Sequence, residues 1–172
     1  MRNLAFAILL GLSLLLTATA CSNQNKDIED ATNVVNEFYR LTQQGDIEAV
    51  NELLTAANRK KNEAEFQKIG VVAEYFIIFA QHSKYEIKSI KLKDDEIHAE
   101  VIVESPNSEL IAEKVMQNFD ASLNMDERQR FFTDNAIKIL QTENIPKITD
   151  KRVMILIKEN GKWKINQPGS FN

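Results

Sequence analysis

The stretch LIKENGKWKI, residues 156–165, decides the fold of this 172-residue chain. Its Asn-Gly pair at 160–161 stands between two runs of strand-forming residues and signals a type I′ hairpin turn, in which both central residues adopt positive φ. In the second strand Trp163 and Ile165 alternate with lysines, so we expect one buried and one solvated side. The preceding strand, residues 152–159, is apolar on both sides, which predicts a central position in an antiparallel sheet.

A second hairpin is predicted earlier in the chain. Residues 85–92 alternate between apolar and charged side chains, but the apolar register shifts near Ser89, which indicates a β-bulge. After a turn at 93–95, residues 97–103 alternate strictly, and Pro106 ends the strand. Together the two hairpins predict an antiparallel sheet of about four strands.

Helices are predicted before the first hairpin. Residues 28–44 place apolar side chains three or four apart, which favours a helix capped by Asp27 and closed by Gly45. Asp46 can cap a second helix, whose apolar side chains recur from Ile47 to Ala57. A third helix is predicted over 66–82. A buried strand over 71–79 is the alternative, because β-favouring residues are nearly continuous there.

Residues 107–145 separate the two hairpins and are predicted to form an insertion of two amphipathic helices. Asp126 and Gln129 come close to a capping box for the second of them. Helices with apolar stripes must bury them against the domain or against a partner. We therefore expect an added helical layer of the core, with a lid or a partner-docking surface as the alternatives.

The N-terminus has the layout of a secretory signal. It has a short basic start, an apolar segment over residues 4–16, and small residues before Cys21. The apolar segment is shorter than the roughly 20 residues that a membrane-spanning helix needs. We predict that residues 1–20 are a signal peptide and that cleavage falls between Ala20 and Cys21, which makes this an exported protein.

Residues 17–21 resemble the lipobox of bacterial lipoproteins, although Ala18 stands where leucine is usual. The resemblance implies that Cys21 receives a diacylglyceryl group and often a further acyl chain such as palmitate, and two chains hold a protein stably on a membrane. The alternative is an ordinary signal peptide whose removal leaves Cys21 as a free thiol. Ser22 in place of aspartate favours the periplasmic face of the outer membrane in a Gram-negative host. Residues 21–27 are then a lipidated cysteine with its polar tether.

Composition describes an ordinary globular protein once the leader is set aside. Roughly 150 residues remain, over 28–172, which is the usual size of one domain with a single core. Hydrophobic residues make up 44% and charged residues 27% of the chain. The net charge of −4 lacks the basic excess that phosphate binding requires, so we expect no nucleic-acid partner. With one cysteine, no intramolecular disulfide can form.

Three motifs connect the two ends of the chain with a known family: Phe38-Tyr39 on the first helix, Gly45-Asp46 after it, and GKWKI at 161–165. With them the chain resembles small exported bacterial lipoproteins of the nuclear transport factor 2-like superfamily, which include domains of unknown function. The resemblance implies a cystatin-like α+β cone, in which N-terminal helices pack on the concave face of a curved antiparallel sheet. The insertion at 107–145 departs from the family pattern.

Histidines offer little for a metal site. His98 alternates with Glu96 and Glu100 on one strand, and this set could bind a metal. The same alternation places all three opposite apolar residues, which favours a solvated strand face instead. His82 falls at a predicted helix end, where a cation complements the helix dipole.

Relatives of this fold include isomerases and dehydratases that use Asp, Tyr or His inside the cone. Tyr75 and Tyr85 could reach such a cavity, yet both also suit a core with a hydrogen-bonded hydroxyl. No phosphate loop, nucleophile elbow or metal-ligand spacing is present in the sequence. We therefore predict no catalytic, cofactor-binding or metal-binding residue, and no cofactor.

These observations favour a noncatalytic binding module anchored in the cell envelope through lipid on Cys21. Its partner would be a small apolar ligand or another envelope protein. One alternative is an inhibitor or toxin-neutralising lipoprotein that turns an acidic surface toward a basic protein. The other is a cone-fold isomerase or dehydratase, which needs a buried acid or histidine in the cavity.

Overall fold

The computed structural model describes residues 24–168. The predicted cleavage site at Ala20 and Cys21 lies outside them. The chain forms, in order, an N-terminal helix (residues 24–44), α2 (Ile47–Leu53), α3 (Ala56–Ile69), α4 (Val72–Gln81), β1 (Lys84–Lys93), β2 (Glu96–Pro106), α5 (Ser108–Met116), α6 (Met125–Thr142), β3 (Lys147–Glu159) and β4 (Lys162–Gln167). In this part of the chain no helix is both long and apolar enough to span a bilayer.

The four strands form one antiparallel sheet in the order β1-β2-β3-β4. The α+β fold and the four-stranded sheet predicted from the sequence are therefore confirmed. β3 pairs with a neighbour on each side, as its two apolar faces indicated. The register of β1 shifts between Ile87 and Ser89, so the predicted bulge is also present.

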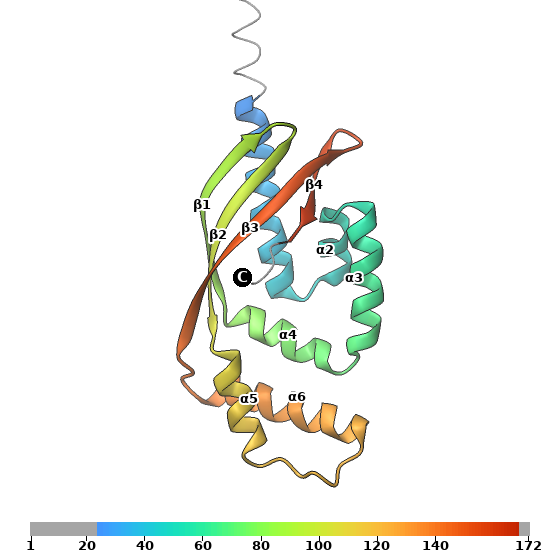
Figure 1. Cartoon of the computed structure of the whole chain (residues 1–172), viewed down its shortest axis with the longest axis vertical. Coiled ribbons are helices and arrows are strands. Elements are labelled where there is room, and N and C mark those ends of the chain that lie inside the picture. Colours follow the sequence, from blue (N-terminus) through green and yellow to red (C-terminus); the bar gives the residue numbers. More distant parts are fainter. Residues whose placement is uncertain (1–23, 169–172) are drawn as a thin grey trace, which may run out of the picture.

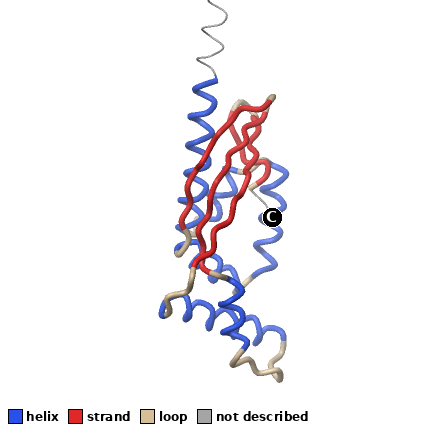
Figure 2. Tube along the Cα trace, turned by 60° about the vertical axis from the view of Figure 1, so that its left-hand side comes forward, coloured by secondary structure: helices blue, strands red, loops and turns tan. Residues whose placement is uncertain are grey.

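The first of two hydrophobic cores lies between the sheet and the N-terminal helix. Figure 2 shows this helix lying along one face of the strands. The core is formed by inward-facing side chains of the helix and of all four strands. Its fully buried members are Ala31, Val35, Ile97, Ala99, Val101, Met154, Leu156 and Ile165.

The second core joins the helical insertion to α4. Tyr75 of α4 packs with Ile111 and Val115 of α5 and with Ala136 and Leu140 of α6. The insertion thus adds a helical layer of its own, at the opposite end of the molecule from the start of the N-terminal helix (Figure 1). Some of its apolar side chains remain outside this layer, since Met116 and Met125 are 54% and 69% exposed.

Two helix boundaries differ from the sequence prediction. The predicted third helix over 66–82 is two helices, α3 and α4, because Gly70 at φ +48° turns the chain between them. The strand alternative over 71–79 is wrong. The second helix ends at Leu53, since Leu54 forms a bridge to Ile165 of β4.

Two predicted caps are also wrong. The N-terminal helix already includes residues 24–27, so Asp27 is not its cap and the predicted tether is shorter. The capping box of α6 is formed by Asn124 and Glu127 rather than by Asp126 and Gln129. In that box the Asn124 side chain accepts from Glu127 N while the Glu127 carboxylate accepts from Asn124 N.

Candidate functional site

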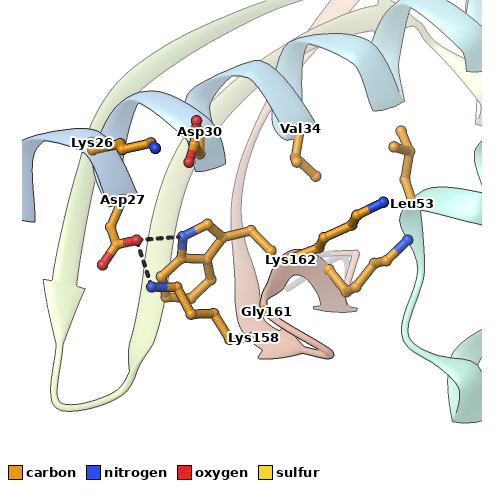
Figure 3. A pocket seen from close by; sticks show the side chains of 10 residues that line it. Lys26, Asp27, Asp30, Val34, Leu53, Lys158, Gly161 and Lys162 are labelled. Carbon is orange, nitrogen blue, oxygen red and sulfur yellow. Dashed lines mark hydrogen bonds and ion pairs between the residues drawn. The ribbon is translucent and has the colours of Figure 1, made fainter. Parts of the chain in front are cut away.

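A groove of about 770 Å³ lies between the first turns of the N-terminal helix, the end of α2 and the β3–β4 hairpin (Figure 3). We call it the hairpin groove. Ten residues line it: Lys26, Asp27, Asp30, Val34, Leu53, Lys158, Gly161, Lys162, Trp163 and Lys164. Such a volume falls in the range of roughly 300–1,000 Å³ that is typical of small-ligand sites.

The predicted Asn-Gly turn positions one wall of the groove. Asn160 and Gly161 adopt φ of +53° and +76°, as a type I′ turn requires. The turn brings Lys158 opposite Trp163 in the register of the two strands. Trp163 is 6% exposed and Ile165 is fully buried, so their predicted core-facing orientation is confirmed.

Asp27 clamps the helix to the hairpin. Its Oδ1 accepts a hydrogen bond of 3.2 Å from Trp163 Nε1 and lies 2.6 Å from Lys158 Nζ. The same ammonium lies 5.0 Å from the centroid of the Trp163 ring, within cation–π range. The hydrogen bond from Lys158 holds the pKa of the Asp27 carboxyl below its usual 3.8, aided by Trp163 and opposed by partial burial.

Two of the four groove lysines have a hydrogen-bond or ion-pair partner within the described residues, and two have none. Lys158 is paired with Asp27, and the Lys164 ammonium donates to the backbone carbonyl of Glu52. Lys26 and Lys162 are exposed, and neither has a hydrogen bond or ion pair within the described residues. They come from opposite walls, one from the helix and one from the hairpin (Figure 3). Between these walls the half-buried side chains of Val34 and Leu53 supply apolar surface, whereas Trp163 is almost entirely buried beside them. The groove can therefore accept a ligand that combines an apolar part with an anionic group.

The tyrosines belong to the cores rather than to this groove. Tyr39 and Tyr85 stack between the helix and the sheet, with ring centroids 4.4 Å apart. Tyr75 packs against Phe79 and Phe132 in the second core. Burial raises the pKa of Tyr39 above its usual 10.0, while the nearby Arg152 guanidinium acts in the opposite direction.

The remaining candidates from the sequence do not come together. His98 Nε2 lies 3.6 Å from Glu96 Oε2 on a partly exposed strand face, but Glu100 instead pairs with Lys151 at 2.8 Å. Over residues 24–168 no group of three or more His, Cys, Asp and Glu side chains could hold a metal ion. His82 is exposed at the end of α4.

A second, smaller groove of about 220 Å³ lies between α5 and α6. It is crossed by an ion pair of 2.7 Å between Lys114 and Glu143. Asn118 and Asn135 add amide groups to its lining, and the Asn135 side chain donates to the carbonyl of Phe131. Part of the polar lining of this groove is thus engaged in contacts within the chain.

Sequence reasoning assigned the hairpin lysines to water and did not find the groove. The one available signal was the concentration of Lys158, Lys162 and Lys164 around a turn in an otherwise acidic chain. Their partner Lys26 is more than a hundred residues away in the chain, so no local pattern connects it to them.

No family model matches this chain, and no curated protein matches it. Among solved structures, the chain is similar to a nuclear transport factor 2-like protein of unknown function from Shewanella oneidensis MR-1. The two sequences are 10% identical and the TM-score is 0.48. The match covers 80% of this chain and 93% of that chain. A candidate dehydratase of the same fold family from Streptomyces avermitilis gives 11% identity and a TM-score of 0.40, over 82% and 92% of the two chains. A candidate polyketide cyclase from Xanthomonas campestris gives 12% identity and a TM-score of 0.39, over 81% and 90%. At these values no residue role or activity is transferred to this chain.

Proposed function

We propose that this chain is a lipid-anchored, noncatalytic binding module of the bacterial cell envelope. In this proposal Cys21 carries the lipid and the hairpin groove holds the ligand. The observation that carries it is the position of the groove. Its first lining residue, Lys26, follows Cys21 by five residues, which span at most about 18 Å of extended chain. The groove would therefore lie next to the membrane surface.

The charges in the groove support binding rather than catalysis. General acid–base catalysis is favoured by groups whose pKa lies near the working pH. The contact with Lys158 moves the pKa of Asp27 away from neutrality, not toward it. Asp, Glu and His side chains are all at least partly exposed within residues 24–168, so none has the desolvated setting of a tuned catalytic acid.

The anchor is tested by metabolic labelling with an alkyne fatty acid in cells that express the full chain. We expect labelling of the wild type and none of Cys21→Ala, whose expression and export are verified in the same cells. A Ser22→Ala variant serves as the control, because it changes the next residue and leaves the thiol in place. Equal labelling of wild type and Cys21→Ala would refute lipidation at this position.

A protein partner is the second candidate, and the exposed methionines of the helical insertion favour it. Met116 and Met125 offer flexible apolar surface at the end of the molecule opposite the groove. Deleting residues 107–145 would uncover Tyr75 of the second core, so point variants test this better. We expect Met116→Glu with Met125→Glu to release an envelope protein captured by crosslinking in cells. Unchanged capture would exclude these side chains as the contact.

A further inference from the structure

We propose that the hairpin groove binds the head group of an acidic phospholipid. This inference rests on the proposed function, because it takes the same groove as the binding site. In the bound state the anionic head group lies in the groove that Lys26 and Lys162 line from its two walls, and the glycerol region contacts Val34 and Leu53. The acyl chains remain in the membrane.

Charge is the first support. The groove is lined by four lysines and two aspartates, whereas the whole chain has a net charge of −4. Asp27 forms an ion pair with Lys158. Of the remaining charged groups that line the groove, one is a carboxylate, Asp30, and three are lysine ammonium groups. Lys26 and Lys162 are the two of these that make no hydrogen bond within the described residues. An anionic head group that meets either ammonium would accept a charge-assisted hydrogen bond, which is about twice as strong as a neutral one.

The apolar surface is the second support, because it separates an amphiphile from a free anion. Val34 and Leu53 present apolar side chains, against which inorganic phosphate has no apolar surface to bury. A phospholipid offers both parts in one molecule. The volume of about 770 Å³ leaves room for a head group with its glycerol. A zwitterionic head group fits less well, since the lysines would repel its quaternary ammonium.

The position of the groove favours a membrane lipid, rather than a soluble molecule, as the source of the anionic head group. Figure 1 shows the start of the N-terminal helix and both hairpin turns together at one end of the molecule. Lys26 lies in the first described turns of that helix, and Lys162 follows the β3–β4 turn. If Cys21 is lipidated, this is the end nearest the lipid head groups.

The test uses the chain from residue 22 to 172, which lacks the lipid. Both hydrophobic cores consist of residues between 31 and 165, so this chain keeps the complete core, and circular dichroism verifies its fold. Trp163 is the only tryptophan and lines the groove, so its fluorescence reports binding. The probes are dihexanoyl-phosphatidylglycerol, dihexanoyl-phosphatidylcholine and inorganic phosphate. Both phospholipids are used below their critical micelle concentrations.

We expect a saturable fluorescence change with dihexanoyl-phosphatidylglycerol, and affinities weaker by about tenfold or more for the other two probes. Lys26→Gln with Lys162→Gln should weaken phosphatidylglycerol binding by a similar factor. The matched control, Lys60→Gln with Lys68→Gln on exposed positions of α3, removes the same charge and should bind as the wild type.

Three results would overturn the inference. They are equal affinity for the two phospholipids, equal affinity for inorganic phosphate and phosphatidylglycerol, and unchanged binding by the Lys26→Gln, Lys162→Gln variant. Because the assay contains no lipidated cysteine, its failure leaves the labelling of Cys21 intact. Loss of that labelling, in turn, leaves the groove assay unchanged, so the two proposals fail separately.

Discussion

Replacing Gly45 by alanine should destabilise this protein more than the same change at Gly161. Gly45 closes the N-terminal helix at φ +73°, where its N–H donates to the carbonyl of Thr42. A Cβ on Gly45 would lie 3.0 Å from Cγ2 and 3.1 Å from Cδ1 of Ile77 on α4. Gly161 has nearly the same φ, +76°, but a Cβ there meets nothing within 4 Å.

The two positions therefore separate backbone strain from crowding. An L-residue in the left-handed region costs about 1–2 kcal/mol. Overpacking typically adds about 1–3 kcal/mol. Alanine also restricts the unfolded chain, which offsets about 0.4–1 kcal/mol at either position. We expect a loss of about 1–4.6 kcal/mol for Gly45→Ala and of no more than about 1.6 kcal/mol for Gly161→Ala.

Urea unfolding followed by Trp163 fluorescence and by circular dichroism measures both losses. The decisive measurement repeats Gly45→Ala in an Ile77→Ala background, which removes the atoms that the new Cβ would meet. The cost of Gly45→Ala should fall there to that of Gly161→Ala. If it stays the same in both backgrounds, contact with Ile77 is not the source of the loss and the reasoning is refuted.

Three further changes test the clamp, the first core and the insertion. Asp27→Asn should cost less than about 1 kcal/mol at neutral pH, because the amide still accepts from Trp163 and only the pairing with the partly exposed Lys158 is lost. Because the pKa of Asp27 is lowered in the folded state, this stabilisation is present above pH 3.8 and is lost as pH falls below it. The free energies of unfolding of wild type and variant, measured with urea, should therefore converge at low pH. A difference that stays constant with pH would contradict this. As pH rises above 10, the wild type should lose more stability than Tyr39→Phe. The reason is that burial raises the pKa of Tyr39 in the folded state, so its phenol ionises at lower pH in the unfolded state. Parallel pH profiles of the free energy of urea unfolding would contradict this. Asn124→Ala should cost about 1 kcal/mol in the same assay by removing the cap of α6, and an unchanged midpoint would exclude that role.

Local signals in the sequence were sufficient where one turn or one strand determines the structure. The Asn-Gly pair at 160–161 needs positive φ at both residues, and the structure has it. The bulge near Ser89 follows from the register of β1 alone. The division between α3 and α4 could not be found in this way, because apolar residues keep helical spacing on both sides of Gly70. At this point the positive φ of Gly70 ends α3, although the apolar periodicity continues.

Contacts between distant residues explain what the sequence did not reveal. Asp27 satisfies the local rule for a helix cap, but its side chain binds Trp163, which is 136 residues further along the chain. The capping box of α6 was predicted two residues too late, because Asn124 rather than Asp126 caps the helix in the folded chain. The hairpin groove needs Lys26 and the β3–β4 hairpin together, and only the folded sheet brings them to one place.

The clamp and the groove together restrict where a ligand can come from. Through Trp163 and Lys158, Asp27 holds the first turns of the N-terminal helix against the sheet. If Cys21 carries lipid, only two residues separate it from residue 24 of that helix, so the groove has little freedom to move away from the bilayer. A soluble ligand does not require this placement, whereas a head group of the bilayer would be within reach from it. The exposed methionines lie at the other end of the molecule, so a protein bound there would not compete with a lipid in the groove.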